Sequence, residues 1–226
     1  MALVSGPFRR YHYVQLEGTM AQPVVMLGGT FDPVHNGHLI IARAVAETLG
    51  FGRVTLVPTA SPPHKQPASA SAQQRLAMIR LAIEGDALFE VSSVELDRPG
   101  PSYTLDTLVH LRQQYGTDVP LYWIIGADML EMLPKWHRSA ELVELAQLVV
   151  AYRPPWTADL EGTFERLATE LPPHRVQEIR RHLVITPQIE ISSKDLRRRV
   201  REGRPVRYMV PPPVEQYIAQ QGLYKG

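Results

Sequence analysis

The fold of this chain is decided by residues 23–49, PVVMLGGTFDPVHNGHLIIARAVAETL. The apolar run Pro23–Leu27 predicts a buried strand. Apolar residues at helical spacing over His38–Leu49 predict a helix that ends at Gly50, a typical C-cap residue. A glycine pair and two histidines occupy the connection between the strand and the helix. The stretch is therefore expected to form a strand–loop–helix unit with a polar, glycine-rich loop.

The remaining chain continues this alternation of strands and helices. Further strands are expected at Arg53–Val57, Phe89–Val91, Leu121–Ile125, Leu148–Tyr152 and Leu183–Thr186. Helices are expected at Ala72–Glu84, Ser102–Tyr115, Ala127–Leu133, Ser139–Leu145, Ser193–Arg201 and Pro213–Gln220. The region rich in Pro, Ala and Ser, Thr59–Ser71, is expected to be a loop, whereas Trp156–His182 is polar, with one or two helices and no strong core pattern. This order predicts an α/β fold with a parallel sheet and helices on both faces, whose ligands bind beyond the carboxyl ends of the strands.

Composition limits the class of protein. The chain has 226 residues, of which 44% are hydrophobic, enough for one large α/β domain. Its formal net charge of +1 argues against a general nucleic-acid or membrane partner. It contains no cysteine, which excludes disulfides and thiolate metal sites and is compatible with a reducing cytosol. We therefore expect a cytoplasmic protein.

The first 22 residues are expected to be an extension of a domain that spans residues 23–226. They are polar and aromatic and lack the apolar segment of a signal peptide. Two interpretations stay open: a flexible arm, or a protein whose translation begins at Met20.

The loop after the first strand has the residues of an anion site. Gly28 and Gly29 allow close backbone approach and unusual φ angles. The helix that starts near Gly37 presents free N–H groups and the positive end of its dipole. His35 and His38 are three residues apart, so both imidazoles can face one phosphate group. The alternatives are an ordinary turn and a structural histidine pair or weak metal site. The loop matches neither the G-x-G-x-x-G nor the Walker A pattern.

A second candidate phosphate site follows the last strand, in residues 191–197, ISSKDLR. Ser192 and Asp195 fit a capping box that opens a helix. Arg197 lies in the first turns of that helix, and its planar fork suits phosphate oxygens. A well-capped basic helix on the surface is the alternative.

Residues suited to a second substrate lie after other strands. Two prolines stiffen the loop that carries Lys65. Ser102 is a candidate N-cap, and the first turn that it opens would favour a carboxylate. The indole face of Trp136 suits a cationic ring. For these residues the alternatives are an exposed lysine, a helix cap and a core tryptophan.

Several of these segments resemble one family. Residues 28–39, GGTFDPVHNGHL, are similar to the H-x-G-H signature of the nucleotidyltransferase superfamily, in the form found in bacterial nicotinate-nucleotide adenylyltransferases. Residues 191–197 resemble the family's I-S-S-T-x-I-R motif, with Lys194 where threonine is usual and a milder departure at Leu196. Further similar elements are PPHK at 62–65, SYT at 102–104, IIGADML and the following tryptophan within 124–136, and QGLY at 221–224.

The resemblance implies a Rossmann-like doubly wound sheet in one nucleotidyltransferase domain. It implies adenylyl transfer from ATP to nicotinate mononucleotide in NAD biosynthesis, with Mg²⁺ carried mainly by the ATP phosphates and no metal ligand from the protein. The implied catalytic residues are His35, His38 and Arg197. Implied ATP-binding residues are Gly28, Gly29, Thr30, Phe31, Gly37, Asp128, Arg153, Ser192 and Ser193. Implied mononucleotide-binding residues are Lys65, Ser102, Tyr103, Thr104 and Trp136.

Several alternatives to this function stay open. The acceptor could be phosphopantetheine or nicotinamide mononucleotide, although the positive helix end at Ser102 favours the carboxylate of nicotinate over an amide. A fragment of a class I aminoacyl-tRNA synthetase shares H-x-G-H, but the chain has no room for a tRNA-binding domain. A non-catalytic nucleotide sensor is the alternative outside the enzymes. The oligomeric state is also open, a homo-oligomer included.

Overall fold

The computed structural model describes residues 22–61, 68–153 and 159–225. Within them six strands form one sheet in the order β3-β2-β1-β4-β5-β6, and every neighbouring pair is parallel. The strands are β1 (Val24–Gly29), β2 (Val54–Pro58), β3 (Phe89–Val91), β4 (Leu121–Gly126), β5 (Gln147–Tyr152) and β6 (Leu183–Ile185). The order and the parallel pairing confirm the expected doubly wound, Rossmann-like α/β fold.

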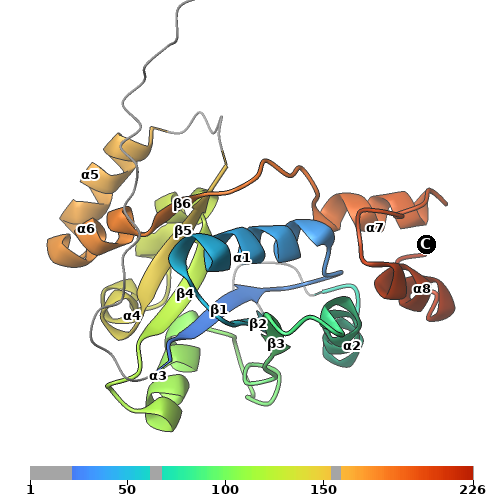
Figure 1. Cartoon of the computed structure of the whole chain (residues 1–226), viewed down its shortest axis with the longest axis horizontal. Coiled ribbons are helices and arrows are strands. Elements are labelled where there is room, and N and C mark those ends of the chain that lie inside the picture. Colours follow the sequence, from blue (N-terminus) through green and yellow to red (C-terminus); the bar gives the residue numbers. More distant parts are fainter. Residues whose placement is uncertain (1–21, 62–67, 154–158, 226) are drawn as a thin grey trace, which may run out of the picture.

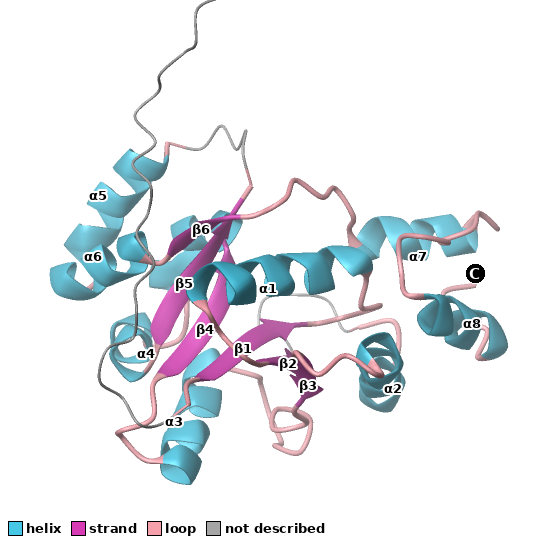
Figure 2. Ribbon diagram, in the orientation of Figure 1, coloured by secondary structure: helices cyan, strands magenta, loops and turns pink. Residues whose placement is uncertain are grey.

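Helices cover both faces of the sheet (Figures 1 and 2). One face is covered by α1 (Asn36–Leu49), α2 (Ala72–Ile83), α7 (Ser193–Arg201) and α8 (Pro212–Gln220). The other is covered by α3 (Thr104–Tyr115), α4 (Ser139–Leu145), α5 (Leu160–Glu170), α6 (Pro173–Arg181) and the 3₁₀ helix η1 (Ala127–Lys135). Since side chains alternate across a strand, Trp123 and Ile125 of β4 pack on the second group, while Ile124 packs on the first.

The polar region 156–182 contributes more to the core than its sequence indicates. Phe164 and Leu167 of α5 are buried, as are Val176 and Ile179 of α6, in the same cluster as the strands β4 and β5. The expectation that this region lacks a strong core pattern was wrong. Each helix buries residues three apart on a narrow stripe, and the polar majority of its sequence conceals that stripe.

The strand order reverses between β1 and β4, and this places the functional edge of the sheet. In doubly wound sheets the connections that follow the two strands at such a point leave towards opposite faces, and ligands bind in the crevice outside the carboxyl ends of the strands. Here β1 ends at Gly29 and β4 at Gly126. The loop into α1 and the start of η1 therefore lie beside that crevice. No helix in the described part of the chain is long and apolar enough to cross a membrane.

Candidate active site

The two histidines of the first loop lie against each other at the start of α1. His35 is the N-cap residue, and its ring stacks on that of His38 with centroids 3.6 Å apart and planes 19° apart. Nδ1 of His38 accepts a hydrogen bond from the backbone N–H of His35 at 3.2 Å. An accepting nitrogen carries no proton, so the neutral His38 ring carries its proton on Nε2. The two rings thus lie in contact, and His38 offers one defined N–H donor.

Burial keeps both imidazoles uncharged at neutral pH. It lowers the pKa of His35 from 6.5 to about 4. Burial, and to a smaller extent the charge of His35, lowers the pKa of His38 well below its usual value. A bound phosphate would oppose these shifts, because a nearby negative charge favours the protonated form. Nδ1 of His35 is buried and has no hydrogen-bond partner within the described residues.

The glycine pair makes room for two aromatic rings of this chain. A Cβ on Gly28 would overlap Cζ2 of Trp123, and one on Gly29 would lie 3.1 Å from Cζ of Phe31. Neither glycine has a positive φ, whereas Phe31 does, at 48°. The expectation that the pair supplies unusual φ angles was therefore wrong. These positions lack a side chain because the rings occupy its space.

Gly37 is constrained by the histidine beside it. A Cβ there would lie 3.1 Å from Nδ1 of His35 and 3.4 Å from Cγ2 of Ile189. A side chain at this position would therefore press on the His35 ring. The lack of a side chain at Gly37 leaves the His35 ring the space that it occupies.

The start of α7 is capped as expected. Oγ of Ser192 accepts from the N–H of Asp195 at 3.1 Å, which confirms Ser192 as the N-cap. The Asp195 carboxylate accepts from the same hydroxyl at 3.0 Å, where a full capping box would have it accept from the Ser192 backbone. The Lys194 side chain is exposed, while Leu196 is buried.

The helix α7 closes directly on the histidine loop. The hydroxyl of Ser193 donates to the carbonyl of Pro33 at 2.9 Å, and Nη1 of Arg197 donates to the carbonyl of Asp32 at 2.7 Å. The two candidate phosphate segments, about 160 residues apart in the chain, therefore form one surface. Arg153 reaches the same region, where its Nη1 donates to the carbonyl of Ile189 at 3.0 Å.

The turn that opens α3 differs in one detail from the expectation. The helix begins at Thr104, its N-cap is Tyr103, and no side chain caps it. Ser102, the expected N-cap, instead accepts from the backbone N–H groups of Ala60 and Ser61 at 3.0 and 3.2 Å. Its hydroxyl is therefore used to tie this turn to the loop after β2. The first N–H groups of α3 are left without a side-chain cap, which suits a carboxylate ligand.

A buried carboxylate, not foreseen from the sequence, lies under this turn. Glu95 is 3% exposed and accepts from the hydroxyl of Thr107 at 2.8 Å through Oε1. Its other oxygen, Oε2, has no hydrogen-bond partner in the described part of the chain. Burial raises the pKa of Glu95. Arg98 lies beside it and donates to the carbonyl of Tyr103 at 3.4 Å.

Asp128 lies in the first turn of η1, and Trp136 is the C-cap residue at which this helix ends. Trp136 is half-buried and packs on the core cluster of its sheet face. The next residue, His137, stacks on the ring of Tyr103 with centroids 4.3 Å apart, which brings Trp136 near the start of α3. Asp128 is exposed and folds back over the end of β4, where a Cβ on Gly126 would overlap its carboxylate. Lys65 lies outside the described residues.

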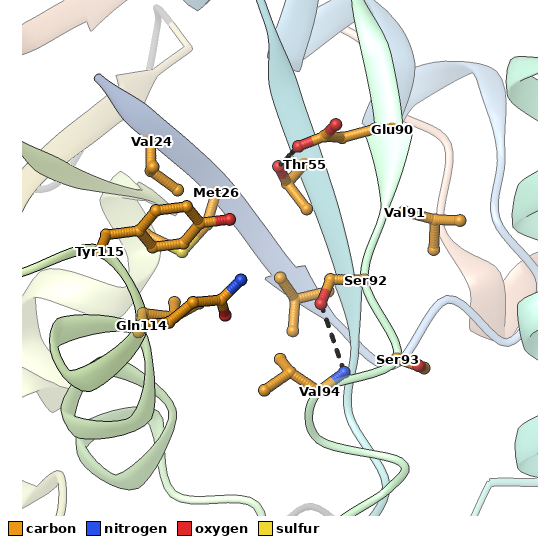
Figure 3. A pocket seen from close by; sticks show the side chains of 12 residues that line it. Val24, Met26, Thr55, Glu90, Val91, Ser92, Ser93, Val94, Gln114 and Tyr115 are labelled. Atoms are coloured by element: carbon orange, nitrogen blue, oxygen red, sulfur yellow. Dashed lines mark hydrogen bonds between the residues drawn. The ribbon is translucent and has the colours of Figure 1, made fainter. Parts of the chain in front are cut away.

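Metal-binding side chains and cavities are two further kinds of place where a ligand could bind. Among the described residues, no group of three or more His, Cys, Asp or Glu could hold a metal ion. A cavity of about 340 Å³ opens on the sheet face beside β1, β2 and α3, lined among others by Met26, Glu90, Gln114 and Tyr115 (Figure 3). None of its lining residues belongs to the predicted site, which lies at the carboxyl ends of the strands.

Comparison with known proteins gives the class and then the family. The cytidylyltransferase-like family model matches residues 26–199, so the chain belongs to this class of nucleotidyltransferases. The probable nicotinate-nucleotide adenylyltransferase of Thermomicrobium roseum is 46% identical over 202 residues, which cover 88% of this chain and 90% of that protein. That of Roseiflexus sp. is 45% identical over 204 residues, covering 90% and 98%. The chain belongs to the nicotinate-nucleotide adenylyltransferase family.

A solved structure supports the fold. The Plasmodium falciparum nicotinic acid mononucleotide adenylyltransferase, complexed with NaAD, superposes with a TM-score of 0.69 at 15% identity, covering 90% of this chain and 97% of that one. At this identity the likeness concerns the fold alone.

Proposed function

We propose that this enzyme transfers the adenylyl group of ATP to nicotinate mononucleotide, giving nicotinate adenine dinucleotide and pyrophosphate in NAD biosynthesis. One observation carries the proposal: α7 closes on the histidine loop through Ser193 and Arg197, so both phosphate-binding segments face one crevice. The names of the relatives support the choice of substrates.

In this proposal the protein catalyses by positioning and by stabilising charge. A phosphate oxygen of the acceptor, already anionic near neutral pH, attacks the α-phosphorus of ATP in line. The bond from that phosphorus to the bridging oxygen breaks, and pyrophosphate leaves with the electron pair. No general base or covalent intermediate is needed. N–H donors of His35, His38 and Arg197, with the N-termini of α1 and α7, face the charge that develops on the phosphates.

The remaining ATP contacts follow the same arrangement. The backbone of Gly28–Phe31 and of Gly37 approaches the nucleotide, and Arg153 lies near its phosphates. Ser192 and Ser193 present the N-terminus of α7. Asp128, exposed beyond the end of β4, accepts hydrogen bonds from the ribose hydroxyls.

The acceptor lies on the α3 side of the crevice. Its nicotinate carboxylate meets the uncapped first turn formed by Ser102, Tyr103 and Thr104. Its pyridinium ring stacks on Trp136. Lys65 meets its 5′-phosphate. The positive helix end favours nicotinate over nicotinamide.

The metal and the cellular setting complete the proposal. The groups proposed to contact the phosphates are mainly N–H groups, which bind anions and not cations. Mg²⁺ would therefore be carried mainly by the triphosphate, and it would supply charge neutralisation on the phosphates. We place the enzyme in the cytoplasm, since a chain without cysteine is compatible with a reducing compartment. The net charge of only +1 argues against a nucleic-acid partner.

A substrate panel tests this function. The full chain is given ATP and Mg²⁺ with nicotinate mononucleotide, nicotinamide mononucleotide or phosphopantetheine, and pyrophosphate release is measured. We expect the highest kcat/KM with nicotinate mononucleotide. Preference for phosphopantetheine would contradict the assignment of the acceptor. ATP binding in calorimetry with no pyrophosphate release from any acceptor would identify a nucleotide sensor instead.

A further inference from the structure

The middle of the histidine loop contains a carboxylate that is removed from solvent. Asp32 is 2% exposed. Its Oδ1 accepts from the hydroxyl of Tyr224 at 2.8 Å and from the N–H of Ala70 at 3.1 Å. Its Oδ2 accepts from the N–H of Ser69 at 2.7 Å. Asp32 therefore joins the histidine loop to the segment before α2 and to the end of the chain after α8.

The same residue holds Arg197. Nη1 of Arg197 donates to the carbonyl of Asp32 and lies 3.8 Å from its Oδ2. Within the described residues the guanidinium makes no other hydrogen bond, so its remaining N–H groups are left for a ligand. In the described part of the chain, the hydrogen bond that holds the Arg197 guanidinium is therefore the one to the Asp32 carbonyl.

A second guanidinium adds to the charge under the loop. Arg75 of α2 is 1% exposed, and its Nη1 donates to the carbonyl of Thr30 at 2.7 Å. Arg197 lies 3.8 Å from the Asp32 carboxylate. Burial lowers the pKa of Arg75 and the charge of Asp32 opposes this shift, so one buried carboxylate acts on both guanidinium groups. It compensates part of their charge and leaves a net positive charge under the loop, which is the sign that a triphosphate needs.

Tyr224 remains a hydrogen-bond donor at any working pH. Burial, and then the negative charge of Asp32, raises the pKa of its hydroxyl. Leu223, the preceding residue, is buried in the cluster that α2, α7 and α8 share. The tyrosine is therefore anchored by the packing around α8, and its hydroxyl has a fixed direction.

We propose that Tyr224 and Asp32 are positioning residues that form a clasp, which sets Arg197 and the histidine loop for adenylyl transfer. The inference rests on the proposed function. The Tyr224 hydroxyl fixes the Asp32 carboxylate, Asp32 fixes its own carbonyl, and that carbonyl holds Arg197. Neither Tyr224 nor Asp32 touches the reacting atoms.

The test is a double-mutant cycle between Tyr224→Phe and Arg197→Lys, with Tyr217→Phe as the matched control. Tyr217 lies half-buried on α8, and its hydroxyl makes no hydrogen bond within the described residues. Hydrogen bonds to charged groups contribute about 1.5–3 kcal/mol, which corresponds to about 10- to 100-fold. We expect Tyr224→Phe to lower kcat by about 10- to 100-fold, with KM for the mononucleotide within about twofold. Tyr217→Phe should match the original enzyme.

The Arg197→Lys background separates positioning from general loss of structure. If Tyr224 acts through Arg197, the two substitutions are coupled and their effects are not additive. In the Arg197→Lys background, adding Tyr224→Phe should then lower kcat by less than about threefold. An undiminished kcat in the single variant, or an equal fall in both backgrounds, would overturn the clasp. Thermal unfolding of each variant sets the assay temperature well below the lowest midpoint. Should the original enzyme release no pyrophosphate at all, the proposed function fails, and the same cycle is then measured in ATP affinity by calorimetry.

Discussion

The two proposed halves of the site, one for the triphosphate and one for the acceptor, each contain one buried carboxylate, and the two carboxylates are held differently. Asp32 lies under the histidine loop with hydrogen bonds to both of its oxygens and with Arg75 and Arg197 beside it. Glu95 lies under the start of α3 with a hydroxyl on one oxygen and no partner on the other within the described residues. The half proposed to hold the triphosphate is thus built with paired charges. The half proposed to hold the acceptor also has a cation, Arg98, near its carboxylate, but within the described residues the hydrogen bond to Glu95 comes from the neutral hydroxyl of Thr107.

This difference follows the ligand that each half is proposed to bind. A triphosphate has several negative charges, and a positive site is needed to hold it and to stabilise the charge that develops during transfer. Buried positive charge must itself be partly compensated, which is the part that Asp32 plays. A carboxylate on an aromatic ring needs only a helix N-terminus and a stacking surface.

The largest effect should come from removing charge under the phosphate half. Asp32→Asn leaves two guanidinium groups without their carboxylate and replaces an acceptor by an amide that cannot satisfy all three donors. We expect the free energy of unfolding to fall by about 3–5 kcal/mol. Glu95→Gln keeps an acceptor for Thr107 and removes a buried ionisable group, so it should cost about 1 kcal/mol or less. Denaturant unfolding measures both, and equal losses would remove the distinction between the halves.

The next effect concerns catalysis in the phosphate half. His38→Ala removes the Nε2–H donor and should lower kcat by about 10²- to 10³-fold, the size of losing one donor to the transition state. His110, exposed on α3, is the matched control, and His110→Ala should leave kcat unchanged. Steady-state kinetics on folded protein decides the matter. A rate equal to that of the original enzyme in the His38 variant would exclude its proposed role.

The two halves should also respond to pH in opposite directions. His35 has a pKa of about 4 when folded and 6.5 when unfolded, so between these values the unfolded state binds more protons. Its contribution to stability is complete above pH 6.5 and is lost as the pH falls towards 4, by up to about 3 kcal/mol. His35→Asn should flatten this slope.

The raised pKa of Glu95 gives the reverse sign. Its folded state binds more protons than its unfolded state, so its contribution is complete at low pH and is lost as the pH rises through the folded pKa. Glu95→Gln should therefore gain stability relative to the original protein as the pH rises from about 4.3. Unfolding curves across the pH range measure both slopes. Slopes of the same sign would contradict the direction of one of the two pKa shifts.

The smallest effect belongs to the acceptor half. Trp136→Ala removes a stacking contribution of about 0.5–2 kcal/mol, so KM for nicotinate mononucleotide should rise by about 2- to 30-fold. The KM for ATP should stay within about twofold. A rise in KM for ATP alone would mean that Trp136 contacts ATP and not the mononucleotide.

Local patterns in the sequence predicted the fold and the local structure of the two candidate phosphate segments. The strand and helix periods are local, and so are the caps at Gly50 and Ser192. The contact between the two histidine rings also follows from a local pattern, because a spacing of three residues at a helix start brings the rings together.

What the sequence missed depends on contacts between distant residues. The bonds of Asp32 to Arg197 and Tyr224 span 165 and 192 residues. The space at Gly28 is filled by Trp123 of a neighbouring strand, and Ser102 serves the loop after β2 in place of its own helix. These contacts depend on how the sheet and its helices pack together, and a local sequence pattern does not predict them.

The central claim is that the α-phosphorus of ATP is the atom attacked. It is tested most directly by supplying ATP with a labelled α-phosphate, or separately a labelled γ-phosphate, together with nicotinate mononucleotide. Adenylyl transfer predicts that the α label appears in the dinucleotide and the γ label in pyrophosphate. A γ label on the mononucleotide, or release of inorganic phosphate with no label in a dinucleotide, would contradict it.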